Sequence, residues 1–300
     1  MLAIADVPRP VPGPGQALVR VGAAAVNRID LSTRNGALAR AGLLAPADQY
    51  SLGWDVAGTV EAVGPGSRFA AGDAVVGLRD VLSAPGTHAE YVVLDDTALA
   101  PAPATVTTEE AATLPLIGLT ADRSLALTGL DAGRTLLVTG AAGGVGGLLL
   151  QLAGLRGIRT VALAGPDDEK RVRGLGADEF VPRQEAGGAT LAAAVRAVVP
   201  GGVDAVVDAA VLGVAAHEAL RGAGTFVALV APFAPPPLRG TRVVVQEVYA
   251  DGARLAELSA LVDAGLLTLT VADALPLDDV ADAHERLAAG GLRGRLVLRP

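Results

Sequence analysis

The sequence predicts an α/β protein with two parts: a small β-barrel or sandwich, then a parallel sheet covered by helices on both faces. Two observations predict this fold. Short β-rich pieces bounded by Gly and Pro turns fill the first hundred residues. From about residue 109, continuous apolar strands alternate with amphipathic helices. The 300 residues are enough for two domains with separate cores.

The expected elements of the first part are four strands and a helical segment. The strands cover 17–21, 58–63, 73–78 and 89–94. The segment 107–127 has a helical pattern, with Thr107 or Thr108 as the N-cap and Glu109 and Glu110 in the first turn. We therefore interpret the two glutamates as a helix start and not as a catalytic carboxylate pair.

The expected elements of the second part alternate regularly. The strands are 135–139, 160–164, 178–181, 203–209, 225–230 and 242–248. The helices are 145–155, 167–175, 191–198, 214–221 and 253–264. One more helical segment and a closing strand, 294–298, complete the chain.

Composition and charge exclude several classes of function. The net charge of −8 argues against a nucleic-acid partner, because such binding needs clustered basic residues. No apolar run is long enough to span a bilayer, and the first residues lack an export signal. The chain has no cysteine, which excludes disulfides, thiolate metal sites and a cysteine nucleophile. We expect a cytoplasmic protein without a membrane partner.

The stretch TGAAGGVGG, residues 139–147, carries the strongest functional signal. It follows a predicted strand and opens a predicted helix, whose first N–H groups attract a phosphate. The spacing is Ala141-x-Gly143-x-x-Gly146, with Ala at the first glycine position. In this series of strand–helix units the loop predicts dinucleotide binding. The alternative is a tight strand-to-helix turn that binds nothing.

The end of the second strand of the parallel sheet favours NADPH over NADH. A dinucleotide without a 2′-phosphate usually pairs its ribose with an acid there, and this chain has Ala164-Gly165-Pro166. Asp167 and Asp168 come slightly later and suit the first turn of the next helix. Lys170, Arg171 and Arg183 follow as candidate partners of a 2′-phosphate. The alternative is that these cations only solvate a helix face.

The sequence resembles a known family, the medium-chain dehydrogenase/reductases, in their zinc-free quinone-oxidoreductase branch. The motifs that carry the resemblance run in family order over nearly the whole chain. They are NRID (27–30), GWDVAGTVEAVGPG (53–66), GDAVVGL (72–78), GTHAEYVV (86–93), AATLPLIGLTA (111–121), TGAAGGVGG (139–147), GADEFV (176–181), VDAVVDA (203–209) and GLRGRLVL (291–298).

The resemblance implies a GroES-like β-barrel domain, residues 1–115 and 266–300, beside a Rossmann doubly wound domain, residues 116–265. It implies that a pyrophosphate meets the glycine-rich turn and that Lys170 and Arg183 lie near the adenosine phosphate. It places Asn27 and Asp30 beside the nicotinamide. The cofactor-binding residues expected are Ala141, Gly143, Gly144, Val145, Gly146, Gly165, Lys170, Arg183 and the backbone of Val230 and Ala231.

The chain departs from the family in three ways. It has no cysteine and three separated histidines, so we expect no metal site. Ser32 stands where relatives carry a Tyr, which leaves the proton donor open. The family's usual opening strand before VPRPVPGPGQALVRV (7–21) is missing, so either the barrel lacks a strand or the recorded start is wrong.

The candidate catalytic residues are Asn27, Asp30 and His88. Each has a structural alternative: a turn-stabilising Asn, an orienting carboxylate and a loop histidine. We interpret His217 as a surface residue of a helix and His284 as part of helix structure.

These observations lead to one main hypothesis and two alternatives. The main one is a zinc-independent, NADPH-dependent oxidoreductase that transfers hydride to a quinone or an α,β-unsaturated carbonyl. The first alternative is a pathway-specific enoyl reductase acting on a natural-product intermediate. The second is a non-catalytic NADPH-binding sensor or structural protein. By resemblance, and from the apolar strand RVVVQEV, we expect a homodimer.

Overall fold

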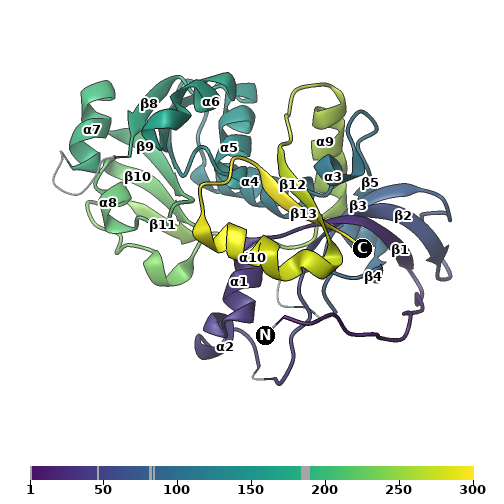
Figure 1. The fold of residues 1–300 in the computed structure, drawn as a ribbon. Helices are drawn as coiled ribbons and strands as arrows, with labels where there is room; N and C mark the ends of the chain where they lie inside the picture. The colour runs from purple at the N-terminus through teal and green to yellow at the C-terminus, as the bar shows by residue number, and fades with distance from the viewer. Residues whose placement is uncertain (1, 46, 81–82, 84, 184–189) are drawn as a thin grey trace. The chain divides into compact units, whose positions relative to one another are not determined.

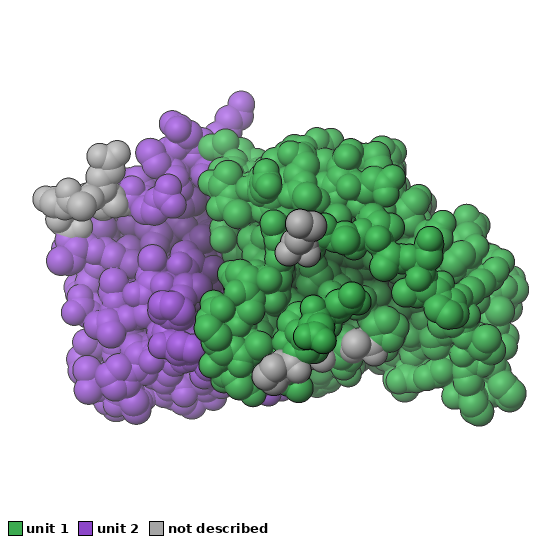
Figure 2. Space-filling model, turned by 60° about the horizontal axis from the view of Figure 1, so that its bottom comes forward, with its two compact units in different colours: residues 1–119, 248–300 green, residues 120–247 purple. Residues whose placement is uncertain are grey.

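The computed structural model describes residues 2–45, 47–80, 83, 85–183 and 190–300. The chain divides into two compact units, which Figure 2 colours separately: residues 1–119 with 248–300, and residues 120–247. Among the described residues, no helix is long and apolar enough to cross a membrane. The units differ from the expected domain boundaries at residues 116–119 and 248–265, which lie in the first unit. The second of these ranges contains the helix α9 (Gly252–Asp263). A Cβ on Gly252 would be only 2.2 Å from the carbonyl oxygen of Leu99, so this helix begins directly against a strand of that unit.

The first unit is built on a seven-stranded sheet with the order β12-β13-β1-β2-β3-β5, in which β4 also pairs with β1 (Figure 1). All pairs are antiparallel except β12 with β13. The strands are β1 (Gln16–Ala25), β2 (Asp55–Val63), β3 (Ala74–Leu78), β4 (Tyr91–Asp95), β5 (Leu99–Pro101), β12 (Val271–Pro276) and β13 (Arg295–Arg299).

The first unit takes strands from both ends of the chain. Ala24 and Ala25 of β1 pair with Leu298 and Val297 of β13, which confirms the predicted closing strand. Its helices are α1 (Arg28–Arg34), α2 (Ala37–Arg40), η1 (Asp96–Ala98), α3 (Thr108–Ala111), the first part of α4 (Leu114–Thr128), α9, η4 (Leu277–Asp279) and α10 (Val280–Ala289). The predicted helix start at Thr107 is confirmed. Its hydroxyl accepts from the N–H of Glu110, whose carboxylate accepts from the N–H of Thr107.

The second unit is a six-stranded parallel sheet with the order β11-β10-β9-β6-β7-β8 (Figure 1). This is the doubly wound order. The strands β6, β7 and β8 follow one another outward on one side of β6, and β9, β10 and β11 follow outward on its other side. The strands are β6 (Thr135–Thr139), β7 (Arg159–Ala164), β8 (Glu179–Pro182), β9 (Val203–Asp208), β10 (Leu220–Ala228) and β11 (Arg242–Val245). The helices are α5 (Gly144–Leu155), η2 (Pro166–Asp168), α6 (Glu169–Gly174), α7 (Leu191–Val198), α8 (Val214–His217) and η3 (Ala231–Phe233).

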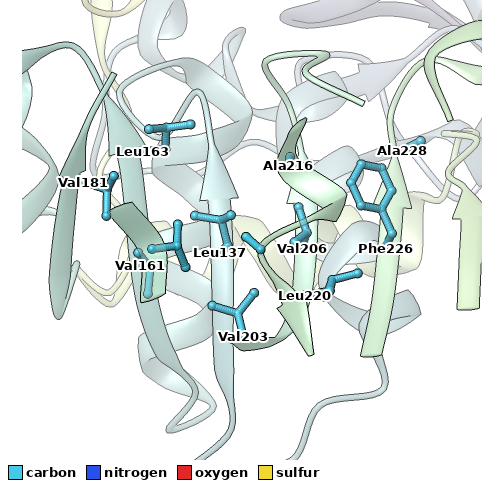
Figure 3. Close-up of a cluster of buried hydrophobic side chains, with 12 residues drawn as sticks. Leu137, Val161, Leu163, Val181, Val203, Val206, Ala216, Leu220, Phe226 and Ala228 are labelled. Atoms are coloured by element: carbon cyan, nitrogen blue, oxygen red, sulfur yellow. The ribbon is translucent and has the colours of Figure 1, made fainter. Parts of the chain in front are cut away.

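Central strands of this sheet are apolar on both faces because both faces are covered. All five residues of β6 are buried. On one face, Leu137 joins Val161, Val206 and Phe226 in a cluster that α7 and α8 complete with Val195 and Ala216 (Figure 3). The continuous apolar strands of the sequence thus correspond to a sheet interior, as the pattern predicted.

Several predicted element boundaries are wrong. The strand expected over 225–230 covers 220–228, the strand expected over 58–63 begins at Asp55, and two other elements end early. The helix expected over 214–221 ends at His217, and β10 begins three residues later at Leu220. Leu220 already pairs with Val203 in the parallel ladder, and the glycines that follow weaken a helix there. The sixth strand, expected over 242–248, ends at Val245. Strand pairing therefore overrode the local helical pattern.

Replacing Leu137 by Ala should destabilise the protein by about 3 kcal/mol, because it opens a cavity in the cluster of Figure 3. The matched control is Leu155→Ala, since Leu155 is 46% exposed at the end of α5 and should cost little. Thermal unfolding of both variants measures the difference. Equal melting temperatures would contradict the packing described here.

Candidate cofactor and substrate site

The predicted cofactor-binding residues gather at one edge of the six-stranded sheet. In the register of the sheet, Thr139 of β6 lies between Asp208 of β9 and Leu163 of β7. Ala228 of β10 pairs with Asp208 on one side, and Ala164 of β7 pairs with Pro182 on the other. All of these are the carboxyl ends of parallel strands, the edge at which doubly wound sheets bind ligands.

The glycine-rich turn brings the start of α5 close to the end of β6. Gly140 has a φ of +62°, which favours glycine, and Ala141 donates its N–H to Leu163 across the sheet edge. A Cβ on Gly146 would lie 2.3 Å from the carbonyl oxygen of Gly140. Only glycine fits at Gly146, so the third glycine of the motif allows close packing of helix and strand.

The amino end of α5 is available to an anion. Gly143 is the N-cap residue, with extended backbone, and no side chain of the described residues caps the helix. Gly143 is exposed, and Gly144 and Val145 are half-buried. Free N–H groups and the helix dipole suit a diphosphate at this point. Ala141 is buried, so its side chain packs inside the turn and does not face an anion.

The expected 2′-phosphate residues lie at the neighbouring strand ends. Gly165 follows β7 directly, and Arg183 donates its N–H to the carbonyl of Ala164 at 2.7 Å. Lys170 is exposed on the first turns of α6. Lys170 and Arg183 form no ion pair within the part of the chain that the structure describes. One acid also approaches: a Cβ on Gly165 would lie 3.0 Å from a carboxylate oxygen of Asp168.

The segment predicted to hold a carboxamide follows β10. Val230 has extended backbone and is 40% exposed, and Ala231 begins the short helix η3. Both residues lie beyond Ala228, at the same edge of the sheet as the glycine-rich turn. The separate parts of the predicted cofactor site therefore lie along the carboxyl edge of the six-stranded sheet.

Sequence reasoning missed two polar residues at this edge. The carboxylate of Asp208 accepts from the hydroxyl of Thr139 at 2.6 Å and from the N–H of Gly213 at 2.8 Å. The two missed residues, Thr139 and Asp208, are both buried. An acid that ends a buried strand, as in VVDA, is the signal that would have identified Asp208.

In the first unit, Asn27 and Asp30 are buried and fully engaged. The Asp30 carboxylate accepts from the N–H of Asn27 at 2.7 Å and from the N–H of Gly53 at 2.8 Å. The Asn27 amide donates to Asp55 at 2.7 Å and to the carbonyl of Ala25 at 3.2 Å. Burial raises the pKa of Asp30 above its ordinary value, against the opposing effects of His88 and these hydrogen bonds.

Asp55 and Arg295, which sequence reasoning missed, complete this network. Asp55 accepts from the N–H of Leu116 at 2.6 Å, and Arg295 donates to the side-chain oxygen of Asn27. Burial raises the pKa of Asp55 to about 7, opposed by the hydrogen bonds from Leu116 and Asn27 and by the charge of Arg295. No sequence signal joins Asn27 to Arg295, since 268 residues separate them.

His88 lies beside this network and also beside His284. Its Nε2 is 3.3 Å from the carbonyl of Ala25, and its ring is 6.5 Å from that of His284, edge to face. The expectation that the three histidines lie far apart is therefore wrong for this pair. His284 is fully buried within α10, and burial, with the charges of His88 and Arg34, lowers its pKa to about 4. A neutral His284 at pH 7 follows.

His217 is buried, so its interpretation as a surface residue is wrong. Its Nε2 is 2.8 Å from the hydroxyl of Thr241, and its ring packs on Phe226 at 5.9 Å. The reason is that α8 is a single turn whose end meets the sheet. Burial and the nearby Arg239 lower the pKa of His217.

Within the described ranges, no group of three or more His, Asp or Glu side chains is placed to hold a metal ion. The pair formed by His88 and His284 has no third ligand there.

A doubly wound sheet with an uncapped glycine-rich helix start is typical of dinucleotide-binding proteins, and this chain also carries a mainly antiparallel unit. Two family models agree. Residues 13–104 match the alcohol dehydrogenase GroES-like domain, and residues 175–298 match the model described as zinc-binding dehydrogenase.

Relatives extend the match over the whole chain. The Arabidopsis thaliana protein named NADPH-dependent alkenal/one oxidoreductase, chloroplastic, is 32% identical over 95% of this chain and 72% of its own length. Mouse quinone oxidoreductase is 29% identical over 98% of this chain and 92% of its own length. A match to Aspergillus niger dehydrogenase azaJ, at 38% identity, spans 36% of that protein. The chain belongs to the medium-chain dehydrogenase/reductase family.

Solved structures agree with this assignment. A mycobacterial protein solved with NADPH has a TM-score of 0.82 and 31% identity, covering 99% of this chain and 94% of that one. A structure titled NAD-dependent alcohol dehydrogenase has a TM-score of 0.87 and 31% identity, covering 99% and 95%. The family and its fold are thus established, with a mainly antiparallel GroES-like unit and a Rossmann unit.

The buried Asp55 predicts a pH dependence of stability. Its pKa is raised from the ordinary 3.8 to about 7, so the fold disfavours its charged form. The stability it contributes is complete below pH 3.8 and is lost as the pH rises through 7. The slope of melting temperature against pH over this window should be less negative in Asp55→Asn than in the parent protein.

The matched control is Asp263→Asn. Hydrogen bonds from Thr105 lower the pKa of Asp263 below 3.8, so this carboxyl group stays charged throughout most of the window. Its replacement should shift the curve of melting temperature against pH without changing the slope of that curve. Parallel curves for the parent protein and Asp55→Asn would mean that Asp55 titrates as an ordinary carboxyl group.

Proposed function

We propose that this protein is a zinc-independent, NADPH-dependent oxidoreductase that transfers hydride to a quinone or an α,β-unsaturated carbonyl compound. The observation that carries the proposal is the uncapped start of α5, held against β6 by Gly146, with exposed cations at the adjacent strand ends. A bound NADPH supplies a hydride at C4 of its nicotinamide ring.

The residues of the second unit have distinct roles in this proposal. The N–H groups of Gly144, Val145 and Gly146 bind the diphosphate. Lys170 and Arg183 bind the 2′-phosphate through charge-assisted hydrogen bonds. The backbone of Val230 and Ala231 holds the carboxamide and so fixes which face of the ring is presented.

The names of relatives support the choice of cofactor and acceptor. The Arabidopsis relative is named for NADPH and for alkenals and enones, the mouse relative is named for quinones, and the mycobacterial neighbour was solved with NADPH. NADH remains the competing cofactor. The carboxylate of Asp168, close to Gly165, suits a ribose hydroxyl, and one structural neighbour is named for NAD.

In the first unit, we propose that Asn27 and Asp30 act as positioning residues. Every oxygen of Asp30 accepts a backbone N–H, and the Asn27 amide is used by Asp55, Ala25 and Arg295, so neither is suited to exchange a proton. His88 is half-buried, and its Nδ1 is buried without a partner among the described residues, while its Nε2 faces the carbonyl of Ala25. It is the candidate donor to the substrate oxygen as an imidazolium or in the tautomer protonated at Nδ1.

We propose that catalysis does not use zinc. The chain has no cysteine, and the described residues bring only His88 and His284 together. Polarisation of the acceptor then depends on hydrogen-bond donors, and water can protonate the product.

The test is oxidation of NADPH in the presence of simple quinones and enones, together with the shift in melting temperature on adding NADPH or NADH. We expect turnover with at least one acceptor class and a larger shift with NADPH. Turnover only on one biosynthetic intermediate would favour the pathway-specific enoyl reductase. A thermal shift without turnover would favour the sensor, and no shift with either nucleotide would overturn the proposal.

Lys170→Ala should raise KM for NADPH about tenfold and leave KM for NADH unchanged, because it removes one charge-assisted hydrogen bond to the 2′-phosphate. The matched control is Arg173→Ala, which removes a positive charge from the same helix. Arg173 pairs with Glu169 at 2.8 Å and with the carbonyl of Asp178 at 3.1 Å, away from the proposed phosphate site. An equal effect of both variants would reject the role of Lys170.

We also propose a homodimer formed through β11. This strand is the edge of the six-stranded sheet, and Val245 is 36% exposed on it. Light scattering should give twice the chain mass of 29.9 kDa. Val245→Pro removes an N–H from the free side of the strand, because the N–H of the next residue, Gln246, donates to Ala228 on the β10 side, and it should shift the mass toward that of one chain. A single-chain mass for the parent protein rejects the dimer.

A further inference from the structure

The loop after β9, residues 209–213, is bonded near one end to Thr139 of β6 and at the other end to Asp208 of β9. The Asp208 carboxylate accepts from the Thr139 hydroxyl at 2.6 Å and from the N–H of Gly213 at 2.8 Å. The same hydroxyl accepts from the N–H of Ala210 at 2.9 Å. Two side chains thus satisfy both ends of the loop, and Thr139 is the residue directly before the glycine-rich turn.

This loop lies between the two backbone segments proposed to bind the dinucleotide. A Cβ on Gly140 would lie 3.4 Å from the N atom of Ala210, so the loop contacts the start of the glycine-rich turn. A Cβ on Gly213 would lie 2.9 Å from the carbonyl oxygen of Phe233, so its far end contacts η3, which begins at Ala231. The loop therefore joins the diphosphate segment to the carboxamide segment.

The middle of the loop is held in an unfavourable conformation. Val211 has a φ of 60°, a region that β-branched residues rarely adopt. Such a conformation persists only where the surroundings determine it, and such residues gather at functional sites. The hydrogen bonds at Ala210 and Gly213 flank Val211 on both sides and supply that constraint.

Asp208 itself is unsuited to act on a substrate directly. It is only 3% exposed, and each of its oxygens already accepts a hydrogen bond. Its position is nevertheless at the centre of the sheet edge, between Ala228 and Thr139. Its role must therefore be exerted through the loop that it holds.

We infer that Asp208, with Thr139, is a positioning residue that fixes the strained loop 209–213 as a rigid wall of the nicotinamide-nucleotide site. A preorganised wall lowers the ordering cost of binding, so its loss weakens affinity more than it weakens the fold. This inference rests on the proposed function, because it assumes that a nicotinamide dinucleotide binds at this edge.

The experiment measures the Kd for NADPH and the melting temperature of the unliganded protein in matched variants. Asp208→Ala removes the tie, and we expect Kd to rise by at least about tenfold. Asp208→Asn keeps an oxygen for Gly213 and offers its NH2 group to the Thr139 hydroxyl, so it should restore most of the affinity. Thr139→Val should resemble Asp208→Ala, and Thr139→Ser, which keeps the hydroxyl, should restore binding.

The control is Asp204→Ala, on the same strand but at its opposite end. Asp204 accepts from the N–H of Thr135 at 2.8 Å and pairs with Arg221 at 2.8 Å, far along β9 from the proposed site. It should lower the melting temperature by a similar amount with no more than about a twofold change in Kd. If Asp208→Ala does not fold, Thr139→Val against Thr139→Ser gives the same comparison.

Three results would overturn the inference. One is an unchanged Kd in Asp208→Ala or Thr139→Val. Another is an equal rise in Kd in Asp204→Ala, which would indicate a general loss of stability. If the parent protein binds neither NADPH nor NADH, the proposed function fails and the inference fails with it. If the parent binds and Asp208→Ala binds equally well, only the inference fails.

Discussion

The second unit depends on how closely the start of α5 approaches the end of β6. Because Gly146 leaves no room for a Cβ beside the carbonyl of Gly140, the first amides of the helix point out at the carboxyl edge of the sheet. No side chain of the described residues caps them. The other polar features of the edge are arranged around this point: cations beyond β7 and β8 on one side, and a tied loop beyond β9 on the other. The proposed anion site is thus formed by backbone groups, so few side-chain changes would remove it.

The first unit places its polar chemistry in its interior instead. Asn27, Asp30, Asp55 and Arg295 form a buried network in which backbone N–H groups and side chains satisfy one another. Such a network stabilises one arrangement strongly because each partner would be costly to leave unpaired. It fixes the turn from β1 into α1 and holds His88 beside the same elements. The hydrogen bonds of the motif NRID therefore explain it as a stabiliser of the turn from β1 into α1.

Much of this structure could be predicted because its signals are local. Alternating apolar strands and helices predicted the parallel sheet, and the glycine spacing predicted the shape of the turn at Gly146. The tie between Thr139 and Asp208 and the bond from Arg295 to Asn27 join residues 69 and 268 positions apart, so no window of sequence contains them. His217 was misplaced for the same reason. Its burial depends on Thr241 and Phe226, which only the sheet brings to it. Tertiary pairing, and not propensity, decided these cases.

The pairing of β1 with β13 has a consequence for how the chain is made. Residues 120–247, the whole second unit, leave the ribosome before Val297 and Leu298 exist to pair with Ala25 and Ala24. The second unit can therefore fold while the first is still incomplete, with the edge of β1 uncovered. An uncovered strand edge is a template for association between nascent chains. The pairing of β13 with β1 thus completes, late in synthesis, the unit whose other strands are made early.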